Sequence, residues 1–313
     1  MKTILTDDPE VAAQFIRRGQ LSAFPTETVY GLGADVFNET AVADIFAAKR
    51  RPADNPLIVH IADISQIQLL ASSISATAEK LIAALFPGPL TVVLARSSAV
   101  SDLATAGLET IAIRMPRNTV ARAFLSACGT PVAAPSANLS GKPSPTTWQA
   151  VAEDLDGRIQ CILQSDPTEI GLESTVVDCT TEEPTILRTG AVSIEDLRMV
   201  VPNIEMFRDD AVGSPRSPGM KHRHYSPRAK VILTRNAASV ELDKNDAYIG
   251  ISKPATAHAL SRIFDSVEEY AHSVFEFFRD CDRAGIKVIY CEVVSETGIG
   301  AALMDRLRRA ADK

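Results

Sequence analysis

Three consecutive cations, Lys49, Arg50 and Arg51, stand directly before Pro52 in the segment KRRPADNPLIVHI. The preceding segment, residues 38–50, carries apolar residues at helical spacing and proline disfavours its continuation, so we expect the cations at a helix C-terminus. Cations at that position interact favourably with the helix dipole and are often merely solvated. The chemical alternative is that they bind an anion, which would require polar groups nearby.

A small-residue loop in PVAAPSANLSGKPS, residues 131–144, is the second candidate for anion chemistry. Hydroxyl and backbone N–H groups in such a loop can approach phosphate oxygens closely, although the ordinary interpretation is a simple strand exit. The chain has no GxxxxGK[ST] motif, and GLGADV lacks the third glycine of a dinucleotide fingerprint, so a nucleotide would be bound by another design. The polar side chains of this loop include Ser136, Asn138, Ser140 and Ser144.

Two arginines and a histidine lie in strand-like segments. Arg114 is in the alternating run TIAIRMP, and Arg188 is in PTILRTG. Because arginine keeps its proton, a half-buried arginine requires an anionic partner, which is either an internal carboxylate or a carboxylate or phosphate of a ligand. The sequence leaves both interpretations open. His60 in LIVHI is more often a satisfied core histidine than a catalytic one.

Several kinds of site have no support in the sequence. The chain contains no GxSxG, HExxH or CxxC motif, which argues against acyl-enzyme hydrolysis and zinc chemistry. The pair His222 and His224 is too small for a metal site, so we predict no metal bound by the protein itself. The five cysteines lie mostly in apolar surroundings, and this favours buried free thiols over disulfides.

The order of the strands and helices expected around these residues predicts a layered α/β or α+β fold. Strand-like runs alternate with helical segments up to about residue 205, and residues 212–230 are dense in proline, glycine and serine with five cations and no acid. This basic segment is typical of a linker. Beyond it, further strands and a long helix predict a smaller Rossmann-like α/β unit. We therefore expect a first domain at 1–207, a linker at 208–229 and a second domain at 230–313.

Composition limits the classes of function. Hydrophobic residues make up 46% of the 313 residues and charged residues 23%, and no apolar run approaches the length of a membrane span, so we expect a soluble protein without membrane partners. The N-terminus has acids where a signal peptide would place its apolar run, and a cytoplasmic location is the expectation. A formal net charge of −7 argues against general nucleic-acid binding, so we do not expect stable direct tRNA binding.

Taken together, the ordered motifs resemble the YrdC-like family in its two-domain threonylcarbamoyl-AMP synthase branch. The resemblance rests on FPTETVYGLG, KRRPADNPLIVHI, the strand with Arg114, APSAN and GLESTVVD, with SPGMKHRHYSP in the linker. Lys49-x-Arg51 and Ser136-x-Asn138 match the K-x-R and S-x-N pairs of the family. The resemblance implies a twisted open sheet with flanking helices, followed by the Rossmann-like domain.

The resemblance also implies an activity. L-threonine, bicarbonate or CO2, and ATP would give L-threonylcarbamoyladenylate and pyrophosphate, with Mg²⁺ carried by ATP. Downstream tRNA threonylcarbamoyl transferase proteins would use the product to form N6-threonylcarbamoyladenosine in tRNA. The residues implied for L-threonine are Thr28, His60, Arg114, Ala134 and Ser174. Those implied for ATP are Lys49, Arg51, Asn55, Thr110, Ser136, Asn138, Ser144, Arg188 and His224, with Lys49 and Arg51 as the catalytic cations.

This chemistry fits the residue types. The threonine amine would capture CO2 as a carbamate that attacks the α-phosphorus, so positioning and charge neutralisation can carry the catalysis without a side-chain nucleophile. Under this interpretation, the basic linker with Tyr225 would also close over the nucleotide as a lid. One alternative is an RNA-binding, translation-related protein without adenylation activity. A nearer one is carbamoyl adenylation in hydrogenase maturation, which uses zinc-type cysteine pairs that this sequence lacks.

Overall fold

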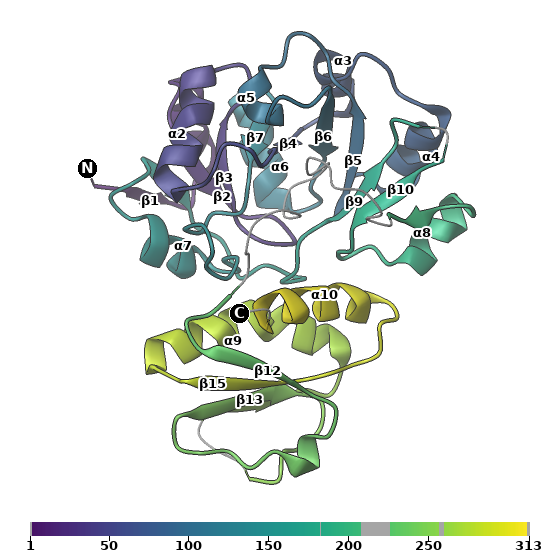
Figure 1. Cartoon of the computed structure of the whole chain (residues 1–313). Coiled ribbons are helices and arrows are strands. Elements are labelled where there is room, and N and C mark those ends of the chain that lie inside the picture. Colours follow the sequence, from purple (N-terminus) through teal and green to yellow (C-terminus); the bar gives the residue numbers. More distant parts are fainter. Residues whose placement is uncertain (1, 182, 208–225, 257–259, 312–313) are drawn as a thin grey trace.

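The structure is a computed structural model that describes residues 2–181, 183–207, 226–256 and 260–311. Figure 1 shows two stacked parts. We call residues 2–207 the large unit and residues 226–311 the small unit. The predicted linker and its proposed role as a lid, together with His224 and Tyr225, fall mostly or wholly outside the described residues.

An eleven-stranded mixed sheet forms the centre of the large unit, in the order β1-β8-β2-β3-β7-β4-β6-β5-β9-β10-β11. Some neighbouring strands are parallel, such as β4 and β6, and others are antiparallel, such as β5 and β6. The strands are β1 (Ile4–Thr6), β2 (Ser22–Phe24), β3 (Gly31–Asp35), β4 (Ile58–His60), β5 (Leu90–Ala95), β6 (Thr110–Arg114), β7 (Val132–Ala134), β8 (Cys161–Leu163), β9 (Thr175–Asp178), β10 (Thr185–Arg188) and β11 (Glu205–Met206).

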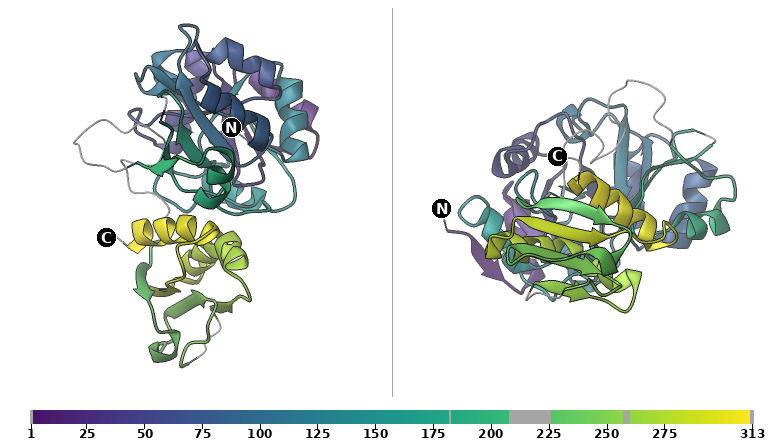
Figure 2. Two further views of the ribbon diagram at one scale, coloured as in Figure 1. Left: turned by 90° about the vertical axis from the view of Figure 1, so that its right-hand side faces the viewer. Right: turned by 60° about the horizontal axis from the view of Figure 1, so that its bottom comes forward.

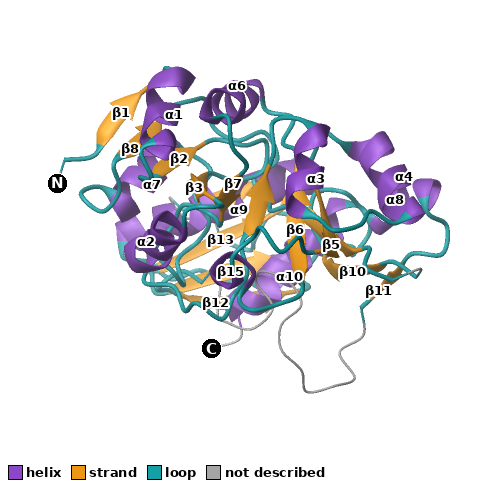
Figure 3. Cartoon of the chain, turned by 90° about the horizontal axis from the view of Figure 1, so that it is seen from above, coloured by secondary structure: helices purple, strands orange, loops and turns teal. Residues whose placement is uncertain are grey.

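Helices cover this sheet on both faces. One pair, α1 and α6, packs together over one face, and the others lie elsewhere around the sheet (Figure 3). The helices are α1 (Pro9–Arg17), α2 (Glu39–Lys49), α3 (Ile67–Leu70), α4 (Ala76–Leu85), α5 (Asp102–Thr105), α6 (Thr119–Cys128), α7 (Trp148–Leu155) and α8 (Ile194–Val200), with a short 3-10 turn at Ile64–Gln66. The expected layered α/β fold is confirmed.

The local signals for the helix that carries the cations act as predicted. Asn38 caps α2 by accepting a hydrogen bond from the backbone N–H of Ala41. At the other end, Arg50 adopts a left-handed conformation with φ 51°, and the N–H of Arg51 bonds back to the carbonyl of Phe46. The chain therefore turns sharply between Lys49 and Arg51 before it reaches Pro52.

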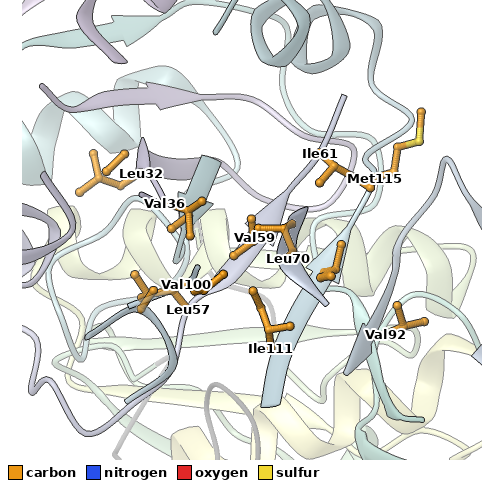
Figure 4. Close-up of a cluster of buried hydrophobic side chains, with 14 of the residues drawn as sticks. Leu32, Val36, Leu57, Val59, Ile61, Leu70, Val92, Val100, Ile111 and Met115 are labelled. Carbon is orange, nitrogen blue, oxygen red and sulfur yellow. The ribbon is translucent and has the colours of Figure 1, made fainter. Parts of the chain in front are cut away.

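Strand alternation separates the hydrophobic core from the other sheet face. Val59 of β4 and Ile113 of β6 belong to the main buried cluster, part of which is drawn in Figure 4. Their neighbours Ile58 and Ala112 belong to a separate small cluster because successive side chains of a strand point to opposite faces. All five cysteines are free and buried, as the sequence predicted.

The small unit is a parallel sheet covered by two helices. Its strands are arranged in the order β12-β15-β13-β14 and every pair is parallel, which agrees with the expected Rossmann-like unit. Figures 1 and 2 show both helices on the side of this sheet that faces the large unit. The elements are β12 (Lys230–Thr234), β13 (Asp246–Gly250), β14 (Ser261–Ile263), β15 (Val288–Glu292), α9 (Val267–Ala284) and α10 (Ile299–Ala311), with a 3-10 turn at Ala237–Ser239.

Candidate functional site

One cavity in the large unit gathers polar and charged side chains from segments far apart in the sequence. It contains about 670 Å³ of empty space, counting its open mouth. Its lining residues are Thr26, Thr28, Val29, Tyr30, Gly31, Arg51, Pro56, Ile58, His60, Arg114, Ala134, Pro135, Ser136, Asn138, Lys142, Ser144, Glu173, Ser174 and Arg188.

The alternation of β4 and β6 directs His60 and Arg114 to this cavity. These two residues are paired directly across the parallel ladder, while Val59 and Ile113 point into the core. Ala134, at the end of β7, pairs with Ile58 on the other side of β4. Three adjacent strands therefore form one continuous wall of the cavity, and the rigidity of the sheet fixes the spacing of its polar groups.

Arg114 has an internal carboxylate partner. Its Nη2 lies 2.8 Å from Oε1 of Glu27, and both side chains are buried. Its Nη1 donates a 2.8 Å hydrogen bond to Oγ1 of Thr28. The ion pair is close but not aligned as a hydrogen bond, and Nη2 of Arg114 and both Glu27 oxygens have no hydrogen-bond partner within the described part of the chain. The guanidinium thus retains donor capacity at the cavity wall.

His60 is both a packed core residue and a cavity residue. Its ring meets the ring of Phe24 edge to face with centroids 5.6 Å apart, and its Nδ1 lies 3.2 Å from the carbonyl oxygen of Ile58. Burial and the nearby Arg114 cation lower the pKa of His60 to about 3. The imidazole is therefore neutral near pH 7, where it can donate or accept a hydrogen bond but cannot neutralise an anion.

Arg51 reaches the cavity because the chain turns at the end of α2. Its Nη2 donates to the carbonyls of Asn55 and Pro56 at 3.2 and 3.3 Å, and these contacts hold the following loop against the guanidinium. Asn55 contributes its backbone to this arrangement but is not part of the cavity wall. Arg51 is the member of the cationic triplet that lines the cavity.

Lys49 lies behind the small-residue loop. It is 1% exposed, and its Nζ donates to the carbonyls of Ser136 and Asn138, both at 2.5 Å. Burial, followed by repulsion from Arg51, lowers the pKa of Lys49 well below its ordinary value. This placement differs from the expectation that Lys49 faces the phosphates, because its Nζ is buried behind the loop and bonded to two backbone carbonyls. A catalytic role through the loop stays a prediction.

The loop that Lys49 supports presents hydroxyl groups to the cavity. Ser136 Oγ donates to Oδ1 of Asn138 at 2.5 Å, and Ser144 Oγ donates to Oε1 of Glu173 at 2.6 Å. On the adjoining side, Arg188 donates through Nε and Nη2 to the carbonyl of Ser174 at 3.1 and 2.9 Å. Hydroxyls, amides and guanidinium groups thus surround the cavity and can together bind a polyanion.

Most of the side chains suggested by the sequence meet at this cavity. Those that line it are Thr28, Arg51, His60, Arg114, Ala134, Ser136, Asn138, Ser144, Ser174 and Arg188. Lys49 and Asn55 lie behind the wall, Thr110 is at the start of β6 outside the lining, and His224 is not among the described residues.

The sequence reasoning missed two cavity-side carboxylates. Glu27 and Glu173 both lie inside quoted motifs, FPTETVYGLG and GLESTVVD, and both are buried. The sequence did contain a signal for these two carboxylates, because each motif has an acidic residue and the chain has arginines that require anionic partners. Only the folded chain shows which acid meets which arginine.

No cluster of metal ligands accompanies the cavity in the part of the chain that the structure describes. The described residues contain no group of three or more histidine, cysteine, aspartate or glutamate side chains suited to a metal ion. Among the described helices, none is long and apolar enough to cross a membrane.

Two family models match successive parts of the chain. A model of the Sua5, YciO and YrdC proteins, described as "Telomere recombination", matches residues 14–190. The chain belongs to this family. A second model, described as the C-terminal domain of threonylcarbamoyl-AMP synthase, matches residues 192–312. The chain thus belongs to the two-domain branch that its motifs resemble, and it is an enzyme.

Individual relatives are similar over nearly the whole chain. A threonylcarbamoyl-AMP synthase of Pyrococcus abyssi is 45% identical, with 96% of this chain and 93% of the relative covered. A Bacillus subtilis protein of the same name is 41% identical, with 98% and 94% covered. A crystal structure of P. abyssi Sua5 complexed with L-threonine superposes with a TM-score of 0.92 at 42% identity, covering 99% of this chain and 98% of that one.

Proposed function

We propose that this chain is an L-threonylcarbamoyladenylate synthase, a nucleotidyltransferase that uses L-threonine, bicarbonate or CO2, and ATP. The observation that carries the proposal is the composition of the cavity lining. Arg114, the neutral His60 and the hydroxyl of Thr28 lie in the same cavity as Arg51 and the hydroxyl-bearing loop 136–144. The full-length similarity to proteins named for this activity supports it.

Arg114 is proposed to bind the carboxylate of L-threonine. Its spare donor capacity beside Glu27 suits a planar two-pronged pair with a carboxylate. Thr28 and His60, which lie next to it, can recognise the substrate hydroxyl by hydrogen bonding. Ala134 and Ser174 complete this subsite, and their small side chains leave room for the bound L-threonine.

ATP is proposed to bind along the loop 136–144 and the adjoining arginines. Arg51 and Arg188 supply fixed positive charge, and Ser136, Asn138 and Ser144 supply hydrogen-bonding groups. Lys49 would act from behind by holding the loop. ATP would enter as its Mg²⁺ complex, so the ion belongs to the substrate. We retain Asn55, Thr110 and His224 as further ATP-binding predictions.

The reaction requires no covalent protein intermediate. The neutral threonine amine forms an N–C bond with CO2 and loses one proton to solvent, and one oxygen of the resulting carbamate attacks the α-phosphorus of ATP. The bond between the α-phosphorus and the bridging oxygen then breaks, and pyrophosphate leaves with that oxygen. Arg51 and Arg188 would stabilise the charge that develops on the phosphates, and the cavity would hold the two reacting groups together.

We propose that the division of the chain follows the family pattern, with a catalytic domain at 1–207, a linker at 208–229 and a Rossmann-like domain at 230–313.

The product is a labile mixed anhydride, so it would pass to tRNA threonylcarbamoyl transferase proteins for N6-threonylcarbamoyladenosine formation. The absence of a spanning helix in the described residues is compatible with action in the cytoplasm.

The test is pyrophosphate release from ATP with bicarbonate and either threonine, serine or no amino acid. We expect release that depends on threonine, together with a product of the mass of threonylcarbamoyladenylate. Release that ignores the amino acid would refute the proposed substrate. Salt-dependent tRNA binding without any pyrophosphate release would instead favour the RNA-binding alternative.

A further inference from the structure

Two arginines of the small unit are buried against the large unit. Arg279 of α9 is 4% exposed and Arg306 of α10 is 1% exposed. A guanidinium removed from water is costly unless a carboxylate and further acceptors compensate for the lost hydration. Both arginines find these partners in the large unit. The partners lie in or beside the segments that carry the proposed ATP-binding residues Ser144 and Arg188.

Arg306 connects three segments of the large unit. Its Nε donates to Oε2 of Glu173 at 2.9 Å, and its Nη2 donates to the carbonyl of Thr189 at 2.8 Å. The other oxygen of Glu173 accepts the 2.6 Å hydrogen bond from Ser144. Thr189 directly follows Arg188 in the chain. One side chain of the small unit is therefore linked to two proposed ATP-binding residues, each through a single intermediate group.

Arg279 supports the small-residue loop from outside the cavity. Its Nη2 donates to the carbonyl of Pro143 at 2.6 Å and to Oδ2 of Asp154 at 2.9 Å. Asp154 in turn accepts from the backbone N–H of Leu139 at 3.2 Å and from Nζ of Lys142 at 2.7 Å. The loop 136–144 is thus held by Lys49 of α2 on one side and by Arg279 on the other.

The two units are in close backbone contact at Gly171, which packs against His272 of α9. Gly171 has φ +81°, and a Cβ there would lie 2.3 Å from the carbonyl oxygen of His272 in α9. The ring Nε2 of His272 lies 2.9 Å from the carbonyl of Thr168. The segment that leads to Glu173 and Ser174 therefore packs directly on α9, and no side chain fits between them.

We propose that the small unit positions the ATP-binding wall of the cavity through Arg279 and Arg306. This inference rests on the proposed function. Neither arginine lines the cavity, so each is a positioning residue rather than a catalytic one. The Arg114 part of the threonine subsite is built differently, because Arg114, Thr28 and Glu27 contact one another within the large unit. Ser174 is the member of this subsite that is bonded to Arg188. Loss of either anchor should therefore impair ATP binding more than threonine binding.

The experiment compares Arg306→Met and Arg279→Met with Arg283→Met in the full chain. Arg283 is the matched control, because it also crosses the interface from α9, to Glu153, but both side chains are about 40% exposed. For each anchor variant we expect the KM for ATP to rise roughly tenfold, which corresponds to the loss of one or two buried hydrogen bonds. The KM for threonine and both constants of the control should stay within about twofold.

A second arm tests the route from Arg306 to Ser144. If Arg306 acts through Glu173 on Ser144, adding Ser144→Ala to Arg306→Met should raise the KM for ATP little beyond the single variants. Arg306→Lys, which keeps a positive charge but loses the two-pronged geometry, should recover part of the affinity and keeps the test available if the methionine variant unfolds. Fully additive effects would refute the route through Glu173, and an unchanged KM for ATP in folded Arg306 variants would overturn the inference.

Calorimetric titration with ATP separates this inference from the proposed function. Wild-type protein that turns over while the anchor variants bind ATP normally would contradict the inference alone. Wild-type protein without threonine-dependent turnover would contradict the proposed function, and the loss of ATP affinity in the anchor variants would still support the positioning role. A wild-type chain that does not bind ATP would overturn both.

Discussion

The buried pair of Arg114 and Glu27 allows the structural and functional roles of one residue to be separated. Arg114→Met would leave the Glu27 carboxylate at 1% exposure without its cation. Removing one member of a buried pair typically costs about 3–5 kcal/mol of unfolding free energy, because the remaining charge stays uncompensated. We expect a loss of this order in urea unfolding measured at neutral pH.

The same substitution should weaken threonine binding. If Arg114 forms a two-pronged, charge-assisted pair with the substrate carboxylate, its loss removes two hydrogen bonds worth about 1.5–3 kcal/mol each, so the KM for threonine should rise at least about a hundredfold. The KM for ATP should change far less. Pyrophosphate release measured against each substrate in turn separates the two effects.

A double substitution, Arg114→Met with Glu27→Gln, provides the decisive comparison. It removes both charges, so part of the lost stability should return, because the uncompensated carboxylate is gone while the glutamine amide stays buried without a hydrogen-bond partner. Threonine binding should not return. A double variant with wild-type KM for threonine would refute the carboxylate assignment. Arg96→Met is the matched control, because its partners Asp102 and Glu109 are mostly exposed and the expected cost is below about 1 kcal/mol.

Three further predictions concern other residues of the site. Arg51→Ala should lower the rate of pyrophosphate release on the order of a hundredfold by removing charge stabilisation, and full activity would contradict its assignment. Lys49→Met should expose its role through the loop: we expect both a higher KM for ATP and a lower midpoint in urea, and a change in rate alone would instead favour direct contact with phosphate. The pKa of His60 is lowered to about 3, so the unfolded chain binds a proton that the folded chain does not as pH falls below about 6.5. Wild-type protein should therefore lose about 2 kcal/mol more stability than His60→Gln between about pH 7 and pH 5, measured by urea unfolding, and parallel losses would contradict a buried neutral ring.

Local signals in the sequence predicted the elements that carry the site. The Asn38 cap and Pro52 bound α2, and the alternation of TIAIR predicts that Arg114 points away from the core. Such signals act within a few residues, so they can be identified without knowledge of the fold. The pairing of β1 with β8 could not be predicted in this way, because it joins Ile4–Thr6 to Cys161–Leu163 across most of the large unit.

Partner choice among charged residues was the other part that the sequence could not provide. Arg279 and Arg306 occur in helical segments rich in charges, RDCDRAG and MDRLRRA, where surface ion pairs are the ordinary expectation. Their burial depends on how the small unit packs on the large one. The sequence pattern predicts on which face of a helix an arginine lies. Which carboxylate pairs with that arginine depends on tertiary contacts, here Arg279 with Asp154 and Arg306 with Glu173.

The K-x-R and S-x-N pairs form one structural unit. Since Nζ of Lys49 bonds to the carbonyls of both Ser136 and Asn138, it fixes the loop backbone at the two residues whose side chains line the cavity. The left-handed turn at Arg50 then brings Arg51 to the same cavity. The spacing of each motif suits this geometry, because one intervening residue separates the buried Lys49 from the cavity-lining Arg51, and one separates the two carbonyls that accept from Lys49.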